Sequence, residues 1–327
     1  MDIDIVIPWV DSNDEEWQKE KAKYSENGNV DARIIRYREW DNLQYVFRGI
    51  ENNLPWIRKI HFITYGHIPL WLNTKHPKLH IVRHSDYIPP EYLPTFSSHP
   101  IELNMYRIEG LSEHFIYAND DTFFIRPLKE RDFFINGLPC DSALETIHTF
   151  KKGGIDSVIQ NDLSVLNAHF SKKNVINAHP LKWFNYRYGK YLLKNIYLYP
   201  FKSFLGFENP HMPNAFLKKT FQELWDCEPI ILKKTSMNKY RSNEDVNQWL
   251  ARYWQLATGN FVPRKINLGK FYSIGKDDIE IERAIVKQKY SMLCLSDDTE
   301  QIDFEYEKEF INSCLKELFP IKSSFEI

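Results

Sequence analysis

The amino-acid sequence predicts an α/β protein with a mainly parallel sheet flanked by helices and a mostly helical insertion. Two observations support this prediction. Short apolar runs alternate with helical patterns over the first 135 residues, and a basic, aromatic segment then interrupts that rhythm. A chain of 327 residues fits one large domain or one domain with a sizeable insertion. We divide it into an α/β ligand-binding part (1–135), the insertion (136–207), and the remainder with the C-terminal tail (208–327).

The first part contains strand and helix patterns in alternation. An apolar run at residues 4–10 predicts the first buried strand, and a charged helix is expected at 15–24. A polar loop over 25–31 leads to a second helix, which begins near the N-cap candidate Asp41 and stops at Pro55. The next expected elements are strands at 60–64 and 79–82, a helix at 100–108, and a strand over 115–121.

The insertion has an unusual charge pattern. Between Leu163 and Phe207 there is no Asp or Glu, whereas seven Lys and Arg residues alternate with eleven aromatic ones. This pattern predicts a basic surface that faces a membrane or an acceptor. A solvated helical face over an aromatic core is the alternative. Two further helices are expected between residues 211 and 259. The first uses Leu217, Phe221 and Leu224, and the second starts after Ser242 and stops at Gly259.

Composition and missing motifs exclude several classes. The net charge of −2 argues against a general nucleic-acid binder, and four cysteines without a CxxC pair indicate neither a zinc site nor a disulfide framework. The sequence contains no GxGxxG, GxxxxGK[ST], GxSxG or HExxH motif. It shows no signal peptide and no apolar run near 18 residues, so we expect action in the cytoplasm, where the inner face of the plasma membrane is accessible.

Paired carboxylates stand at the end of the segment 115–121, where an apolar strand runs into them. Asp120 and Asp121 stand where a parallel strand turns out into the ligand crevice. Adjacent carboxylates repel each other unless a cation lies between them, and a hard divalent cation prefers oxygen ligands. The pair therefore predicts a metal site that holds a diphosphate, with a solvated Asx turn as the alternative.

A second group of candidates follows the first strand. Trp9 can stack on a base, and the carboxylates of Asp11 and Asp14 can bind ribose hydroxyls. A core tryptophan before a capped helix explains the same residues equally well.

Two later segments add candidates. His211, expected just ahead of a helix, is a plausible general base or phosphate contact, although a lone histidine is more often structural. Ser242 and Asp245 fit a capping box at the start of a helix. A capping box does not explain Arg241, whose guanidinium can form a bidentate contact with phosphate oxygens.

The chain resembles the Stealth family, the bacterial capsular and cell-wall polysaccharide phosphotransferases, which are similar to the catalytic subunit of animal N-acetylglucosamine-1-phosphotransferase. The resemblance spans roughly half of the chain, and the long second block is the most specific. Departures are modest: Pro8 stands where many relatives have Thr, Asp11 where the animal proteins have Asn, and Ser296 where Asn is frequent. The matching blocks are Asp4–Asp14, Arg38 to about Pro127 (with Pro55–Ile60, Ile68–Asn73, Leu93–Ser98 and Asn119–Asp121), His211–Asp245, and Cys294–Asp298.

The resemblance implies a fold of the GT-A or Rossmann-like nucleotide-sugar type and transfer of a sugar 1-phosphate from a UDP-sugar, with release of UMP. The acceptor would be a hydroxyl of a lipid-linked oligosaccharide or polysaccharide. Peripheral membrane association is a separate expectation, which comes from the basic, aromatic segment. Asp120 and Asp121 would hold Mg²⁺ or Mn²⁺, Arg241 would clamp the phosphate and His211 would take the acceptor proton, with Glu244 or Asp245 next in line. The nucleotide-sugar side would comprise Trp9, Asp11, Asp14, Arg38, Asp41 and Arg107.

Two other functions compete with phosphotransfer. A conventional metal-dependent UDP-sugar glycosyltransferase would use the same metal and uridine sites but would release UDP. A non-catalytic polysaccharide-assembly protein would bind lipid-linked glycan through the basic segment and release no nucleotide. The identity of the released nucleotide therefore distinguishes all three.

Overall fold

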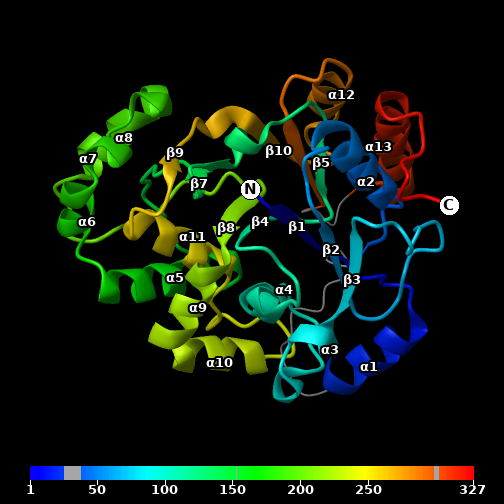
Figure 1. Ribbon diagram of the computed structural model, residues 1–327, viewed down its shortest axis with the longest axis horizontal. Helices are drawn as coiled ribbons and strands as arrows, with labels where there is room; N and C mark the ends of the chain where they lie inside the picture. Colours follow the sequence, from blue (N-terminus) through cyan, green and yellow to red (C-terminus); the bar gives the residue numbers. More distant parts are fainter. Residues whose placement is uncertain (26–37, 152, 298–301) are drawn as a thin grey trace.

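Five strands form the central sheet, in the order β3-β2-β1-β4-β8. The computed structural model in Figure 1 describes residues 1–25, 38–151, 153–297 and 302–327. Among the strands that the structure describes in this sheet, β1 to β4 are parallel to one another, and β8 runs antiparallel to β4. The predicted α/β class with a mainly parallel sheet is thus confirmed. The five strands are β1 (Ile3–Pro8), β2 (Ile60–Thr64), β3 (Leu79–Arg83), β4 (His114–Tyr117) and β8 (Asn214–Leu217).

The central strand β1 is buried on both faces. Ile3, Ile5 and Ile7 pack into one apolar cluster, while Val6 belongs to a second cluster on the other face. A strand that is apolar apart from Asp4 is expected where helices cover both sides of a parallel sheet.

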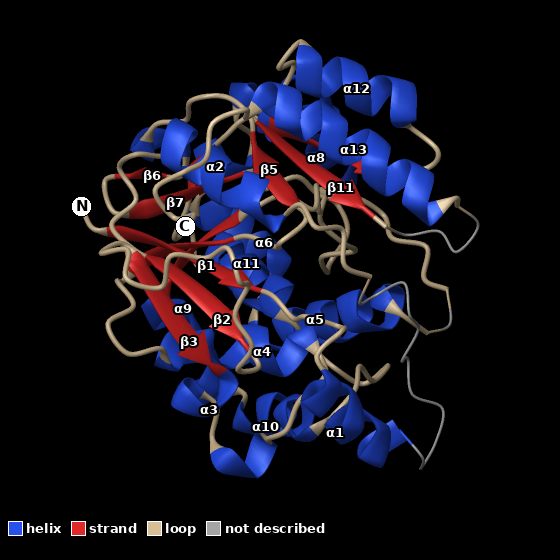
Figure 2. Ribbon diagram, turned by 90° about the vertical axis from the view of Figure 1, so that its right-hand side faces the viewer, coloured by secondary structure: helices blue, strands red, loops and turns tan. Residues whose placement is uncertain are grey.

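Helices cover the two faces separately, as Figure 2 shows. On the Ile5 face, α2 lies so close to strand β5 that a Cβ at Gly49 would stand 2.7 Å from the carbonyl oxygen of Phe124. The helices of the Ile5 face are α2 (Leu43–Asn53), α12 (Asp278–Val286) and α13 (Phe304–Leu318). Those of the Val6 face are α3 (His84–Tyr87), α4 (Ser98–Asn104), α9 (Lys218–Cys227), α10 (Pro229–Met237) and α11 (Gln248–Ala257).

Two small sheets extend the central one. The first has the order β10-β11-β5, and its strand β5 follows β4 after only four residues. The second has the order β6-β7-β9. Their strands are β5 (Thr122–Phe124), β6 (Phe134–Ile135), β7 (Leu138–Asp141), β9 (Val262–Pro263), β10 (Gly269–Ser273) and β11 (Met292–Ser296).

The predicted insertion contains a group of helices, and α6, α7 and α8 lie at the left edge of Figure 1. Its core is aromatic, with Trp183, Tyr188, Phe204 and Phe207 all buried together with residues of α11. The core thus uses several of the eleven aromatic residues of this segment. The helices are α5 (Ile155–His169), α6 (Lys172–Ala178), α7 (Pro180–Trp183) and α8 (Leu192–Leu198). None of the helices that the structure describes has both the length and the apolarity to cross a membrane.

Several element predictions are confirmed and several are wrong. The strands β1 to β4 and helices α1 (Glu15–Ser25), α2 and α4 lie close to their predicted positions, whereas most of the predicted loop at 25–31 falls outside the described residues. Asp41 is not the N-cap of α2, because the helix begins at Leu43 with Asn42 as its cap. Leu217 belongs to β8, so His211 precedes a strand and not a helix.

A buried charge network fixes the start of β1. Asp4 accepts hydrogen bonds from Arg58, from His61 and from the backbone N–H of Ser112. Burial alone would raise the pKa of Asp4, but these hydrogen bonds outweigh burial and hold the pKa below its ordinary value of 3.8.

We therefore expect Asp4→Ala to destabilise the fold by about 3 kcal/mol, because one partner of a buried charge pair is lost. Since the folded-state pKa is lowered, the carboxylate stabilises the native state above its unfolded pKa, and this contribution disappears as the pH falls through the folded value. Urea unfolding of both proteins at neutral and acid pH measures the effect. An equal difference at both pH values would show that the lost packing, not the charge, matters.

Candidate functional site

Strand order brings three distant segments to one edge of the central sheet. β2 and β3 lie on one side of β1, and β4 lies on the other, so the order changes direction between β1 and β4. Ligands of open α/β sheets bind at the carboxyl ends of the strands beside such a point. Trp9 follows β1 and Asp120 follows β4 at this edge, and the antiparallel direction of β8 places His211, ahead of that strand, there as well.

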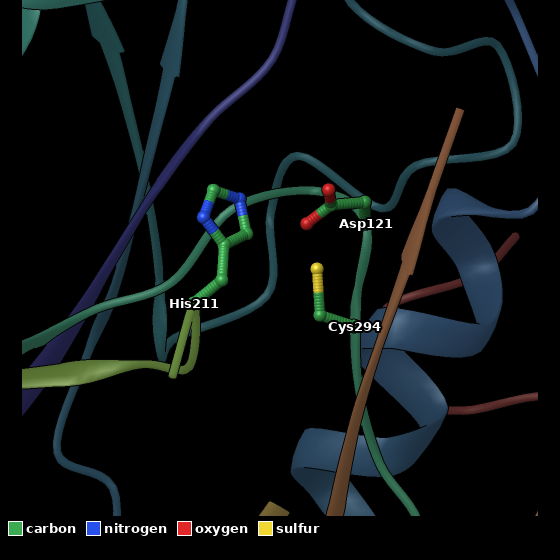
Figure 3. A group of neighbouring side chains, drawn as sticks. All are labelled: Asp121, His211 and Cys294. Atoms are coloured by element: carbon green, nitrogen blue, oxygen red, sulfur yellow. The ribbon is translucent and has the colours of Figure 1, made fainter. Parts of the chain in front are cut away.

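Three side chains converge at the junction of the central sheet with the β10-β11-β5 sheet. Asp121 stands just before β5, His211 precedes β8, and Cys294 lies on β11, where it pairs with Thr122. One potential ligand atom from each lies within 4.8 Å of the other two. Figure 3 shows the carboxylate, the imidazole and the thiol pointing toward one another from these three segments. Such a group of carboxylate, nitrogen and sulfur atoms can hold a metal ion.

The acidic groups at this junction have raised pKa values. Burial, then the neighbouring charges of Asp121 and Glu39, raises the pKa of Asp120 to about 8. Burial also raises the pKa of Asp121, although the charge of His211 opposes the rise. Burial, followed by the negative charge of Asp121, raises the pKa of the Cys294 thiol well above its ordinary value of 9. Negative charge here is unfavourable in the isolated protein, and a bound divalent cation would relieve it.

The backbone of His211 has an uncommon conformation. Its φ of +53° lies in the left-handed region, which non-glycine residues seldom adopt. The imidazole lies edge-on to Phe271 at 5.5 Å and to Trp249 at 6.3 Å between ring centroids. The side chain is nevertheless exposed, so aromatic neighbours orient a ring that remains accessible.

The segment after β1 forms the adjoining part of the edge. The Trp9 ring stacks on Phe62 at 5.7 Å between centroids, and its Nε1 donates to Glu39 at 3.3 Å. The backbone N–H of Asp11 donates to His67 at 2.7 Å. Burial raises the pKa of Glu39, which in turn acts on Asp120. Glu39 therefore links the segment after β1 to the paired aspartates.

Three predicted nucleotide-binding residues already have structural partners. The Asp14 carboxylate accepts the N–H of Trp17 at 2.7 Å and so caps α1. Asp41 forms an ion pair with Lys308, and Arg38 lies 3.4 Å from the carboxylate of Asp297.

A cavity of about 770 Å³ lies beside this segment. A volume of this order suits a small-molecule ligand. Arg38, Glu39 and Asp41 line it, but Asp121, His211 and Cys294 do not. Glu39 is thus the residue common to the cavity and to the electrostatic environment of Asp120. The remaining lining residues come from the segment 12–25 and from Phe304 and Lys308 of α13.

Arg241 lies on the loop before α11. Its Nη2 donates to the hydroxyl of Ser98 at 3.0 Å, at the start of α4. Burial is the largest cause that raises the pKa of Tyr117, and the charge of Glu102 is the next. The charge of Asp120 raises this pKa further, whereas that of Arg241 lowers it. The charges of Asp120 and Arg241 therefore act on the same phenol at the end of β4.

Asp245 holds this loop in place. Its carboxylate accepts from Asn238 at 2.6 Å and from the N–H of Ser242 at 2.8 Å, and it lies 2.7 Å from His99 Nδ1. Asp245 is itself fully buried. The predicted capping box is wrong as a helix start, because α11 begins at Gln248 with Asn247 as its cap. The bonds of Ser242 and Asp245 instead close a turn beside Arg241.

Glu244 and Arg107 lie away from the group of Asp121, His211 and Cys294. Glu244 is exposed and forms an ion pair with Lys234 at 2.6 Å. Arg107 lies on the connection that enters β4 at its amino end, whereas Asp120 follows the carboxyl end. Its guanidinium stands 4.9 Å over the ring of Trp225.

Sequence reasoning missed Glu39 and the contact made by Cys294. Glu39 lies between two residues that were selected, Arg38 and Asp41, but nothing in its type or spacing distinguishes it. Cys294 begins the last matching block, and that was the available signal. Its contact with Asp121 depends on the pairing of β11 with β5, which joins positions far apart in the chain.

Comparison with known proteins gives a consistent result. Two family profiles match, "Stealth protein CR1, conserved region 1" over residues 1–29 and "Stealth protein CR2, conserved region 2" over residues 36–140. The chain is 41% identical to a capsular polysaccharide phosphotransferase WcwK of Streptococcus pneumoniae, across 99% of this chain and 98% of the relative. It is 37% identical to the receptor polysaccharide phosphotransferase WefC of Streptococcus gordonii, across 99% of both chains. It is 36% identical to the exopolysaccharide phosphotransferase cps2G of Lactiplantibacillus plantarum, across 99% and 96%.

A solved structure of the galactosyltransferase LgtC in complex with donor and acceptor sugar analogs is a more distant match. It aligns over 95% of each chain with 9% identity and a TM-score of 0.37, and we base no inference on it.

Proposed function

Because the chain belongs to the Stealth family and is a polysaccharide phosphotransferase, we propose that it transfers a sugar 1-phosphate from a UDP-sugar to a cell-surface polysaccharide. The transferred group is a hexose or N-acetylhexosamine 1-phosphate, and the acceptor is a hydroxyl of the growing chain. The convergence of Asp121, His211 and Cys294 beside Asp120, at the edge where α/β sheets bind ligands, is the observation that supports this proposal most strongly.

The bond changes in this reaction are simple. The acceptor oxygen forms a bond to the sugar-bearing phosphorus, and the bond from that phosphorus to the bridging oxygen of the diphosphate breaks. UMP leaves with the bridging oxygen, and a phosphodiester joins the sugar to the acceptor. Such transfers depend chiefly on in-line positioning and on neutralising the charge of the phosphoryl oxygens.

The paired aspartates suit a divalent cation. Burial raises the pKa values of both Asp120 and Asp121, so a bound cation would favour their charged forms, and their oxygens are ligands that Mg²⁺ and Mn²⁺ accept. Asp120 and Asp121 would hold the ion, which when bound would neutralise charge on the diphosphate.

The other roles fall to protein side chains. His211 takes the acceptor proton on a ring nitrogen, and its exposed position beside Asp121 gives a hydroxyl access to it. Arg241 contacts the transferred phosphate, with Ser98 and the turn closed by Asp245 fixing its loop. Trp9, Asp11 and Glu39 position the uridine side of the donor next to the cavity bounded by Arg38.

We expect Arg241→Lys to lower kcat by about 10²–10³-fold, because a single ammonium cannot reproduce two parallel bonds to phosphate oxygens. The matched control is Glu244→Gln, three residues along the same loop, which should retain near-normal activity because Glu244 pairs with Lys234 at the surface. Steady-state rates with the preferred donor measure both variants. Full activity of the lysine variant would show that Arg241 does not contact the transferred phosphate.

Incubation with a panel of UDP-sugars and Mg²⁺ or Mn²⁺, scored for released nucleotide, tests the proposed function. We expect one donor to yield UMP in an acceptor-dependent manner. Release of UDP would indicate glycosyl transfer, and the absence of any nucleotide release across the panel would contradict a catalytic role.

A further inference from the structure

An outward apolar face on helix α8, in the basic insertion, remains unexplained by the transfer reaction. Leu193, Ile196 and Tyr197 are 69%, 54% and 71% exposed. Their spacing places them on one side of a helix. Figure 1 shows α8 on an outer lobe of the molecule, away from the central sheet.

The opposite side of α8 is firmly anchored. Asn195 is buried and its side-chain amide donates to the carbonyl oxygens of Ala143 and Trp183, both at 2.7 Å. Leu198 is also buried, and its carbonyl oxygen accepts from the buried Lys172 at 2.6 Å. These contacts fix the rotation of the helix, so the three apolar side chains cannot turn inward.

More apolar side chains of the same lobe are exposed. Single exposed apolar residues are common on protein surfaces, so we rely on the three residues that share one side of α8, and the other exposed residues of the lobe only add to its apolar character. The additional members are Leu181 (82%), Tyr186 (79%) and Phe201 (44%).

The charge of the lobe identifies the kind of partner. No acidic residue occurs between Leu163 and Phe207, whereas Lys190 and Lys202 are exposed in the chain on either side of α8. Lys194, on α8 itself, already forms an ion pair with Glu208. A short apolar face flanked by lysines and aromatic residues is the pattern by which helices lie in the interface of an anionic bilayer.

We propose that the α8 face docks on the surface of an anionic phospholipid membrane, with Leu193, Ile196 and Tyr197 entering the interface and Lys190 and Lys202 contacting lipid phosphates. This surface is separate from the cluster around Asp121. Its occupant is a lipid surface and not the glycan acceptor, because Leu193 and Ile196, two of the three side chains, are aliphatic and cannot form hydrogen bonds with sugar hydroxyls.

Flotation of the full chain with vesicles tests this proposal without donor or acceptor, so its outcome does not depend on the transfer reaction. We expect binding to vesicles of one part phosphatidylglycerol and two parts phosphatidylcholine, weak binding to pure phosphatidylcholine, and loss of binding as salt increases. Replacing Leu193, Ile196 and Tyr197 together by Ser should weaken binding by at least about tenfold.

The matched control replaces Ile230, Met237 and Ile279 by Ser. These residues are 82%, 61% and 65% exposed on α10 and α12, and their removal should leave binding unchanged. If the first variant does not fold, Lys190→Gln with Lys202→Gln provides a second test, with an expected loss of about fivefold per lysine. Equal vesicle binding by wild type and the α8 variant overturns the proposal. The proposal is also overturned if the α8 variant binds vesicles normally but transfers less to a soluble acceptor fragment, because the face would then contact the glycan.

Discussion

Asp121→Asn is expected to abolish transfer, with a loss of about 10³-fold or more at any practical metal concentration. The amide keeps the shape of the carboxylate but is a neutral and poor ligand for a divalent cation. Asp121 is the residue at which the candidate metal ligands meet, since its carboxylate lies within 4.8 Å of ligand atoms of both His211 and Cys294. Steady-state rates across a Mg²⁺ or Mn²⁺ titration measure the effect.

Two controls make this result specific. Asp226→Asn changes an exposed carboxylate on α9 and should leave both the rate and its metal dependence unchanged. The Asp121 variant itself should unfold no more easily than the wild type, because removing a negative charge from a site that disfavours it costs no stability. Near-normal, metal-dependent activity of Asp121→Asn would contradict the metal assignment. Asp120→Asn should behave similarly to Asp121→Asn.

Replacement of His211 is expected to produce the second large loss, about 10²–10⁴-fold in kcat if its imidazole accepts the acceptor proton. Because His211 has a φ of +53°, alanine would add backbone strain to the loss of the ring. Asparagine tolerates this conformation better and is therefore the cleaner replacement. Comparable losses in His211→Ala and His211→Asn would show that the imidazole, not the backbone, is responsible.

His211 also lies close enough to Asp121 and Cys294 to be a metal ligand, and metal dependence distinguishes the two roles. If His211 is the base, its replacement lowers kcat at saturating metal and leaves the half-saturating metal concentration unchanged. If His211 is a metal ligand, its replacement raises the half-saturating metal concentration, and excess metal restores much of the activity. His169→Ala serves as a control, because His169 pairs with Glu228 at the surface and should tolerate replacement. Recovery of His211→Asn in excess Mn²⁺ would transfer the role of base to another group.

Local patterns predicted the parallel half of the fold well. The strands β1 to β4 are short, mainly apolar runs, and helix α2 has a strongly one-sided apolar face. In each of these elements the signal lies in neighbouring residues, so one sequence is sufficient. The paired aspartates could be selected for the same reason, because they directly follow an apolar strand.

Features that depend on distant pairing could not be predicted in this way. Leu217 was predicted to belong to a helix, because Leu217, Phe221 and Leu224 have helical spacing, and the pairing of β8 with β4 makes it part of a strand. Cys294 reaches Asp121 through the pairing of β11 with β5. The roles of Asp14 and Asp245 were also ambiguous, since a carboxylate that caps a helix or closes a turn has the same sequence signature as one that binds a ligand.

Transfer from a doubly labelled donor tests phosphotransfer most directly. The UDP-sugar carries ³²P at the sugar-bearing phosphorus and ¹⁴C in the sugar, and the products are separated into polymer and free nucleotide. We predict that both labels enter the polymer in equal amounts, that unlabelled UMP is released in the same amount, and that Asp121→Asn forms neither product. Appearance of ¹⁴C in the polymer with ³²P remaining in released UDP would contradict phosphotransfer and establish glycosyl transfer instead.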